Sequence, residues 1–102
     1  VLDALALGTT GGAAILRRPD IGSLEPGKCA DIAIWPAVDV FSSGCENPVD
    51  ALLLCYARQV EALVVGGRVR IAGGKFTGLD LDALIAQHHG RARQIHAALA
   101  SS

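Results

Sequence analysis

The chain has 102 residues, of which 51% are hydrophobic and 19% are charged. This composition excludes a disordered chain, and the length predicts one domain at most. The formal net charge of −1 gives no electrostatic case for binding nucleic acid or an acidic membrane surface. No apolar run approaches the roughly 20 residues that span a bilayer, and no basic region precedes the apolar N-terminus. We therefore expect a soluble, cytoplasmic domain without nucleic-acid or membrane partners.

Residues 1–16 carry apolar side chains at helical spacing, which predicts a first helix. The run Gly8-Thr9-Thr10-Gly11-Gly12 interrupts this pattern with poor helix formers. Its paired glycines indicate either close approach of another backbone or a break into two short helices. Arg17 and Arg18 suit the last helical turn, where cations complement the helix dipole, and Pro19 ends the helix.

A turn-rich loop over residues 20–30 leads into a short strand. The loop contains the turn residues Pro26-Gly27, and the strand is expected over residues 31–35, ending before Pro36. The apolar run of this strand is too continuous for one wet face, so we expect both faces to be covered.

A second helix is expected over residues 48–57. Asn47 is a suitable N-cap, and Pro48 fits the first helical position, where no amide hydrogen is needed. One side of this helix is apolar and consists of Val49, Leu52, Leu53 and Tyr56.

A β-hairpin is expected around Gly66-Gly67. Strand-like segments over residues 60–65 and 68–72 flank this pair, and both central positions of a type I′ turn need positive φ. Gly73-Gly74 ends the second strand, and residues 75–77 are a candidate third strand.

The C-terminal segment predicts a long helix that is capped by the side chain of Asp80. Its apolar stripe follows 4-3-4-3-4 spacing, the pattern of a packed helical seam. The stripe consists of Leu81, Ile85, His88, Ala92, Ile95 and Leu99. Fewer than three heptads do not define a coiled coil, so we expect the helix to dock onto another helix or onto the sheet.

The histidines and cysteines do not form a metal-binding pattern. His88 and His89 point about 100° apart on a helix, and His96 lies two turns further on. We expect His88 to pack in the apolar stripe, and His89 and His96 to face solvent or a partner. The three cysteines contain no C-x-x-C pair, which indicates neither a zinc site nor a disulfide framework. We expect Cys29, Cys45 and Cys55 to be buried or half-buried thiols.

The other motifs do not amount to a self-contained active site. The glycine-rich run at residues 8–12 lacks the Gly-Lys-Ser/Thr ending of a P-loop and does not follow a strand. Ser23, Ser42 and Ser43 lack the G-x-S-x-G context of an activated serine. Lys28 is interpreted as a solvated loop lysine. We therefore expect no catalytic, cofactor-binding or metal-ligating residue; a small-ligand site at the glycine-rich helix is the weakest alternative.

Three parts of the chain together resemble the C-terminal quarter of amidohydrolase-superfamily deaminases. They are residues 5–16, Asp20-Ile21-Gly22-Ser23-Leu24-Glu25-Pro26-Gly27-Lys28 with Ala30-Asp31, and residues 60–69. The element order is similar as well: final barrel helix, return loop, strand, helix, hairpin and terminal helix. Pro48-Val49-Asp50-Ala51-Leu52 and Leu81-Asp82-Ala83-Leu84-Ile85 are most similar to the branch of 8-oxoguanine, guanine and hydroxyatrazine deaminases.

The resemblance implies an α+β fold without a complete TIM barrel. The return strand and the Gly-Gly hairpin would form the small sheet of the family's composite β-domain, with flanking helices. Residues 1–19 would be equivalent to the end of the barrel, residues 20–79 to the small β-domain with one inserted helix, and residues 80–102 to a C-terminal packing helix.

Members of this family hydrolyse C–N bonds, commonly in nitrogen heterocycles, with zinc or iron in a (β/α)₈ barrel. Their metal ligands lie upstream of the matched segment, so the resemblance assigns no catalytic residue to this chain and implies a metal for the full-length family only. We expect a structural fragment of such an enzyme that is inactive alone. The start at Val1 and the absence of Met favour a missing natural beginning. The alternative is a free-standing oligomerising module derived from such an enzyme.

The resemblance also implies a partner. In the family, strands of the small domain pair with strands from the enzyme's N-terminus, and exposed sheet edges are templates for pairing with another chain. We therefore expect a homo-oligomer, formed through these edges or through the helix face from Leu81 to Leu99, with exchanged elements as one form. A marginally stable fold is the other outcome.

Overall fold

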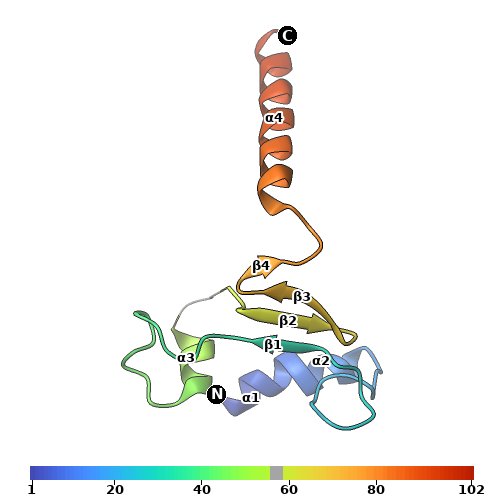
Figure 1. The fold of residues 1–102 in the computed structure, drawn as a ribbon, viewed down its shortest axis with the longest axis vertical. Helices are drawn as coiled ribbons and strands as arrows, with labels where there is room; N and C mark the ends of the chain where they lie inside the picture. The colour runs from blue at the N-terminus through green and yellow to red at the C-terminus, as the bar shows by residue number, and fades with distance from the viewer. Residues whose placement is uncertain (56–58) are drawn as a thin grey trace.

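The computed structural model describes residues 1–55 and 59–102. Three short helices come first in the chain, and four strands follow, with α3 between the first and second strands and α4 after the last (Figure 1). In chain order the elements are α1 (Leu2–Ala6), the π-helix η1 (Leu7–Gly11), α2 (Gly12–Ile15), β1 (Ile32–Ile34), α3 (Pro48–Leu54), β2 (Ala62–Val65), β3 (Arg68–Ala72), β4 (Lys75–Phe76) and α4 (Leu81–Ala100).

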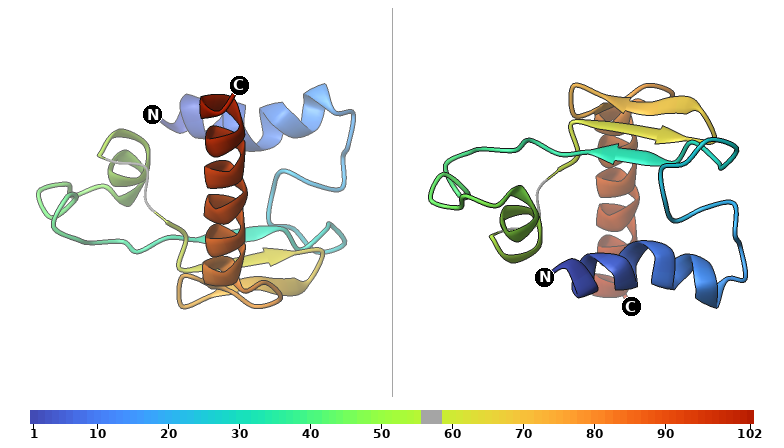
Figure 2. Two further views of the ribbon diagram at one scale, coloured as in Figure 1. Left: turned by 90° about the horizontal axis from the view of Figure 1, so that it is seen from above. Right: turned by 90° about the horizontal axis from the view of Figure 1, so that it is seen from below.

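The four strands form one open antiparallel sheet in the order β1-β2-β3-β4. The continuous helical stretch α1–η1–α2, which we call the first helical segment, lies on the β1 side of this sheet (Figure 2). Its α1 packs against α3. The described residues form no closed barrel, which confirms the α+β class and the small sheet of return strand and hairpin. The division at residues 19 and 79 stays a prediction.

The glycine-rich run keeps the chain helical as a π-helix between α1 and α2. A threonine hydroxyl in a helix can donate to the carbonyl four residues back, which has a second lone pair. The hydroxyls of Thr9 and Thr10 do so, donating to Leu5 O at 2.8 Å and Ala6 O at 3.4 Å. The expected break into two short helices is therefore wrong.

Close approach of another backbone, the other interpretation, occurs next to this run. A Cβ at Gly22 of the return loop would lie 2.8 Å from Ala13 Cβ and 3.0 Å from Thr9 O. Gly22 on the approaching loop is thus the residue that must be small. It also has a positive φ of 91°, which glycine adopts easily.

The first helix ends before its two arginines. Arg17 has a φ of 54°, and its amide donates to Ala14 O, while the Arg18 amide donates to Ala13 O, both at 3.0 Å. This pair of bonds is a Schellman motif with an arginine in the position that usually holds glycine. The prediction that Arg17 and Arg18 occupy the last helical turn is wrong.

Two glycine pairs shape the sheet as the sequence predicts. Gly66 and Gly67 have φ of 57° and 77°, and they join β2 to β3. Gly73 and Gly74 have φ of 57° and 74°, and the strand that follows them is β4. The hairpin and the third strand are confirmed.

The sheet is only partly covered by the described residues. Ala33 is exposed, and Ile34 is 49% exposed, so the prediction that both faces of the return strand are covered is wrong for this chain. Among the described residues, the buried hydrophobic ones are Ala13, Ala51 and Ile71, one each from α2, α3 and β3. The core therefore lies between the first helical segment, α3 and the sheet, and it is small.

Both predicted helix caps are present. Asn47 Oδ1 accepts from the Val49 amide at 2.9 Å, with Pro48 as the first residue of α3. Asp80 Oδ1 accepts from the Ala83 amide at 3.0 Å. Helix α3 ends at Leu54, and the predicted continuation over residues 56–57, including Tyr56, lies outside the described residues.

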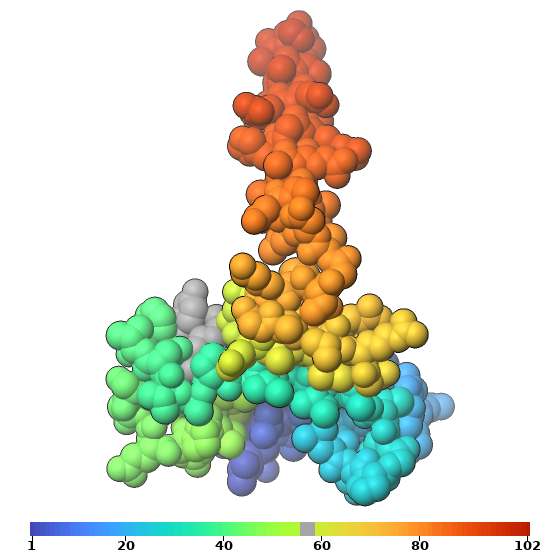
Figure 3. All heavy atoms as spheres, viewed as in Figure 1, coloured from blue at the N-terminus to red at the C-terminus, as the bar shows by residue number. Residues whose placement is uncertain are grey.

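Helix α4 projects from the sheet as a separate column (Figures 1 and 3). It has no buried residue, and His88 is exposed. Among residues 1–55 and 59–102 the predicted docking of α4 and the predicted packing of His88 are therefore wrong, because these residues do not bury the apolar stripe of α4. Among the described residues, no helix is both long enough and apolar enough to cross a membrane.

The first testable prediction concerns the turn at Gly66-Gly67. An added Cβ at Gly66 would contact nothing within 4 Å, so any cost of G66A comes from the positive φ alone. We expect G66A to lower the free energy of unfolding by about 1 kcal/mol in urea denaturation. Gly78 is equally uncrowded and has no positive φ, so G78A is the matched control. Equal effects of G66A and G78A would contradict the prediction.

Candidate functional site

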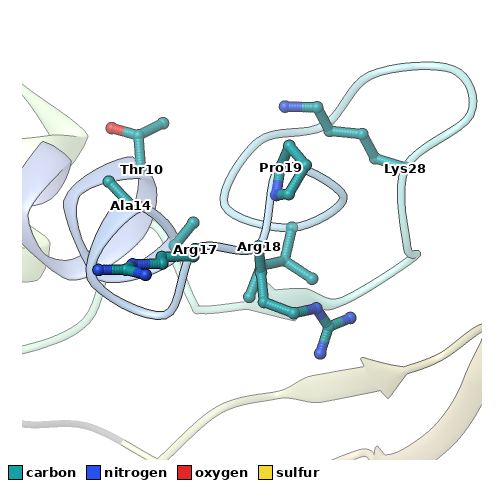
Figure 4. Close-up of a pocket in the computed structure, with 8 residues that line it drawn as sticks. Thr10, Ala14, Arg17, Arg18, Pro19 and Lys28 are labelled. Carbon is teal, nitrogen blue, oxygen red and sulfur yellow. The ribbon is translucent and has the colours of Figure 1, made fainter.

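Two hollows lie between the first helical segment and the return loop, residues 20–30. The first has a volume of about 460 Å³ and is bordered by α2, by the Schellman turn and by Lys28 (Figure 4). Its lining consists of Thr10, Ala13, Ala14, Arg17, Arg18, Pro19, Ile21 and Lys28.

Asp20 is the centre of a polar cluster at this hollow. Arg18 donates to its carboxylate through Nε at 2.8 Å and Nη2 at 2.6 Å. The Cys29 thiol donates to the same carboxylate at 3.3 Å, and the Cys29 amide donates to Asp20 O at 2.7 Å. Asp20 therefore joins the start of the return loop to its end.

The cluster shifts the protonation of its members. The hydrogen bonds from Arg18 and Cys29 hold the pKa of the Asp20 carboxyl well below its usual range. The bond to Asp20 also raises the pKa of the Cys29 thiol, because a thiolate could not donate to the carboxylate. Cys29 is thus held as a thiol, which is the unreactive form.

Lys28 is bound by the same loop. Its Nζ donates to Ser23 Oγ at 2.7 Å and lies 2.8 Å from Glu25 Oε2, and the side chain is 27% exposed. Lys28 lowers the pKa of the Glu25 carboxyl, and Ser23 adds to the effect by donating to it. The interpretation of Lys28 as a solvated loop lysine is wrong, since it is half-buried and holds the loop together.

The basic residues around the first hollow do not form a converging anion site. The side chains of Arg17, Arg18 and Lys28 point in different directions (Figure 4). Arg18 and Lys28 are each bound to a carboxylate of the loop itself. Their arrangement stabilises the return loop and leaves little charge to hold a ligand.

The second hollow, of about 510 Å³, lies between the first helical segment and β1. Gly8, Thr9 and Gly12 from the glycine-rich run line it, and the Thr9 hydroxyl is already bonded to Leu5 O. The large apolar residues of the lining are Leu5, Leu16, Ile21, Leu24, Ile32, Trp35 and Leu52. An apolar lining of this kind is suited to packing against protein or an apolar group.

No metal-binding constellation is present in residues 1–55 and 59–102, where no three His, Cys, Asp or Glu side chains gather to hold an ion. The three histidines all lie on the exposed surface of α4. Ser42 is buried, and its hydroxyl donates to Asp39 Oδ1 at 3.0 Å in a tight turn. Within the described part of the chain, none of the sequence's nucleophile candidates lies in a catalytic arrangement.

All three cysteines are half-buried, as the sequence predicts, but two of them lie unexpectedly close together. Cys45 Sγ and Cys55 Sγ are 3.0 Å apart. Sequence reasoning missed this pair because a spacing of 10 residues across a helix does not show that the ends meet. It also missed the Arg18–Asp20 pair, although Pro19 between them was a usable signal for an extended turn.

The chain is similar to hydrolases of known activity. The family model described as "Amidohydrolase family" matches residues 1–76. The chain is 46% identical over 89 residues to an 8-oxoguanine deaminase from Pseudomonas aeruginosa, covering 87% of this chain and 20% of that protein. It is 34% identical to a 5-methylthioadenosine/S-adenosylhomocysteine deaminase from Nitratidesulfovibrio vulgaris, covering 81% of this chain and 19% of that protein.

The fold is similar to solved structures of the same family. The atrazine chlorohydrolase of Arthrobacter aurescens TC1, in a complex with zinc, matches with a TM-score of 0.78 at 32% identity, covering 84% of this chain and 19% of that one. The chain therefore belongs to the amidohydrolase family. It spans about a fifth of the length of the relatives that it matches.

The second testable prediction concerns Asp20. Because its folded-state pKa is lowered, its stabilisation is present above about pH 4 and is lost as the pH falls. Because the folded-state pKa of Cys29 is raised, its contribution is present below about pH 8.5 and is lost as the pH rises. A plot of the thermal midpoint against pH should therefore fall at acid pH (the acid limb) and at alkaline pH (the alkaline limb). We expect D20N to flatten both limbs.

The control for this experiment is the pair of variants R18Q and D20N/R18Q. The double variant should have the same acid limb as D20N, since the two side chains act through one ion pair. An unchanged acid limb in D20N would contradict the prediction.

Proposed function

We propose that the chain is the C-terminal structural part of a metal-dependent amidohydrolase that deaminates a nitrogen heterocycle, and that it is not catalytic alone. The observation that carries this proposal is the 46% identity to an 8-oxoguanine deaminase over 87% of this chain and 20% of that protein. A purine-like heterocycle is the favoured substrate class, because two of the matched relatives are named as deaminases of purine compounds.

In such an enzyme a bound zinc or iron ion would activate water for attack on the carbon that carries the amino group. The described residues of this chain do not provide the donor set for that ion. We therefore assign the chain a supporting role: its return loop and sheet hold the two hollows in shape. The apolar second hollow is suited to packing against the remainder of the enzyme.

The third testable prediction separates the two parts of this proposal. The matching segment of the Pseudomonas aeruginosa 8-oxoguanine deaminase is replaced by this chain, and ammonia release from 8-oxoguanine is measured with zinc present. We expect turnover by the chimera and none by the 102-residue chain alone. Turnover by the chain alone would overturn the non-catalytic role, and a folded but inactive chimera would overturn the supporting role.

We propose as a second candidate a free-standing module that forms homo-oligomers. The observation that favours it is the uncovered apolar stripe of α4, in which Ile85 is 56%, Ile95 60% and Leu99 69% exposed. Exposed apolar surface of this kind is typical of an interaction site. The sheet edge at β1 is the other candidate contact, because its outer backbone groups can pair with another chain.

The fourth testable prediction concerns the α4 stripe. We expect I85D/I95D to shift the sedimentation of the chain toward the monomer, because two buried carboxylates would oppose association. The matched control is A86D/Q94D, which adds the same charge on the opposite side of the helix and should leave the oligomeric state unchanged. An identical oligomeric state for both variants and the parent chain would exclude the stripe as the contact.

A further inference from the structure

Cys45 and Cys55 are two thiols that the proposed function does not use. Cys45 precedes the cap of α3, and Cys55 is its C-terminal cap residue. A helix of seven residues is about 10 Å long, so the two cysteines belong to opposite ends of α3 in the sequence. Their sulfurs are nevertheless 3.0 Å apart, because the segment before α3 folds back along the helix.

The backbone on both sides of this contact is anchored. The Cys45 amide donates to Ser42 O at 2.9 Å, and Ser42 is only 1% exposed. The Cys55 amide donates to Ala51 O at 3.3 Å, and Ala51 is only 2% exposed. Two buried residues thus anchor the backbone that carries the two thiols, while the cysteine side chains themselves are half-buried.

We propose that Cys45 and Cys55 form a redox modification site, which closes to an intramolecular disulfide when a low-molecular-weight disulfide such as oxidised glutathione is the oxidant. A disulfide bond is about 2.05 Å long, so the sulfurs need to move together by about 1 Å. Rotation of the two side chains supplies a movement of this size without rearranging α3.

The reaction balances as two thiol–disulfide exchanges. One cysteine thiolate attacks the oxidant, forms a mixed disulfide and releases one glutathione thiolate. The second cysteine thiolate then attacks the protein sulfur of that mixed disulfide, forms the Cys45–Cys55 bond and releases the second glutathione thiolate. The protein loses two protons and two electrons, and the oxidant is reduced to two thiols.

Cys29 does not take part in this chemistry. Its thiol donates to Asp20 in the return loop, and that bond raises the pKa of the thiol. The thiolate is the attacking species, so Cys29 reacts more slowly than an unshifted cysteine would. The structure therefore favours one pairing among the three that three cysteines allow.

Closing the pair would tie the C-terminal end of α3 to the turn at residues 39–45. The disulfide closes a loop of residues 45–55 and restricts the unfolded chain, which raises the thermal midpoint of the oxidised form.

The experiment measures the equilibrium between the reduced chain and its disulfide in glutathione buffers, with remaining thiols alkylated and located by peptide mass spectrometry. We expect the Cys45–Cys55 bond with Cys29 alkylated in native buffer. We also expect its equilibrium constant to be at least about tenfold larger in native buffer than in concentrated urea, because the fold holds the thiols together. C29S should leave both results unchanged, whereas C45S and C55S should each abolish the bond.

The thermal midpoint of C29S supplies a second readout. Oxidation should raise it, and reduction by dithiothreitol should return it to the starting value. The proposal is overturned by any one of three results: equal equilibrium constants in native buffer and urea, preferential pairing of Cys29, or an oxidised C29S chain without a raised midpoint.

Discussion

The bond between the Asp31 carboxylate and the Gly66 amide fixes how the return loop meets the hairpin. Asp31 directly precedes β1, and its Oδ1 accepts from the Gly66 amide at 2.7 Å, while the Gly67 amide donates to Ala30 O at 3.0 Å. These two contacts set Ile32 opposite Val64 at the start of the β1–β2 ladder. The loop contacts at Gly22 then place the first helical segment beside β1, so both hollows depend on this register.

Little apolar burial supports this arrangement. The radius of gyration is 18.8 Å, whereas a compact domain of this length has about 13 Å. The projecting helix α4 accounts for much of the difference, and residues such as Ile15 and Val40 are more than 80% exposed. With so small a core, backbone ladders and helix caps must contribute a large share of the stability.

The predictable parts of the fold are those whose cause lies within a few residues. Asn47 and Asp80 cap their helices through bonds that span two or three positions, and Gly66-Gly67 makes its turn through backbone freedom alone. The errors at Ile34 and His88 concern side chains that need a distant partner. The exposed Ile34 and the exposed His88 were expected to be covered, because periodicity shows which face is apolar and does not show what lies against it.

The candidate site follows the same division between local and distant causes. The turn at Pro26-Gly27 was predicted, but the charges that hold the loop were not, since Asp20 and Cys29 meet only when the loop closes over nine residues. The contact of Cys45 with Cys55 is of this second kind too, because it depends on a segment folding back along α3. In a chain with a small core, such loop-closing contacts determine both the shape of the hollows and the reactivity of the thiols. The reactivity of the thiols therefore depends on contacts between residues that are distant in the sequence. The motifs that can be recognised in the sequence, in contrast, lie mainly at tight turns and helix caps.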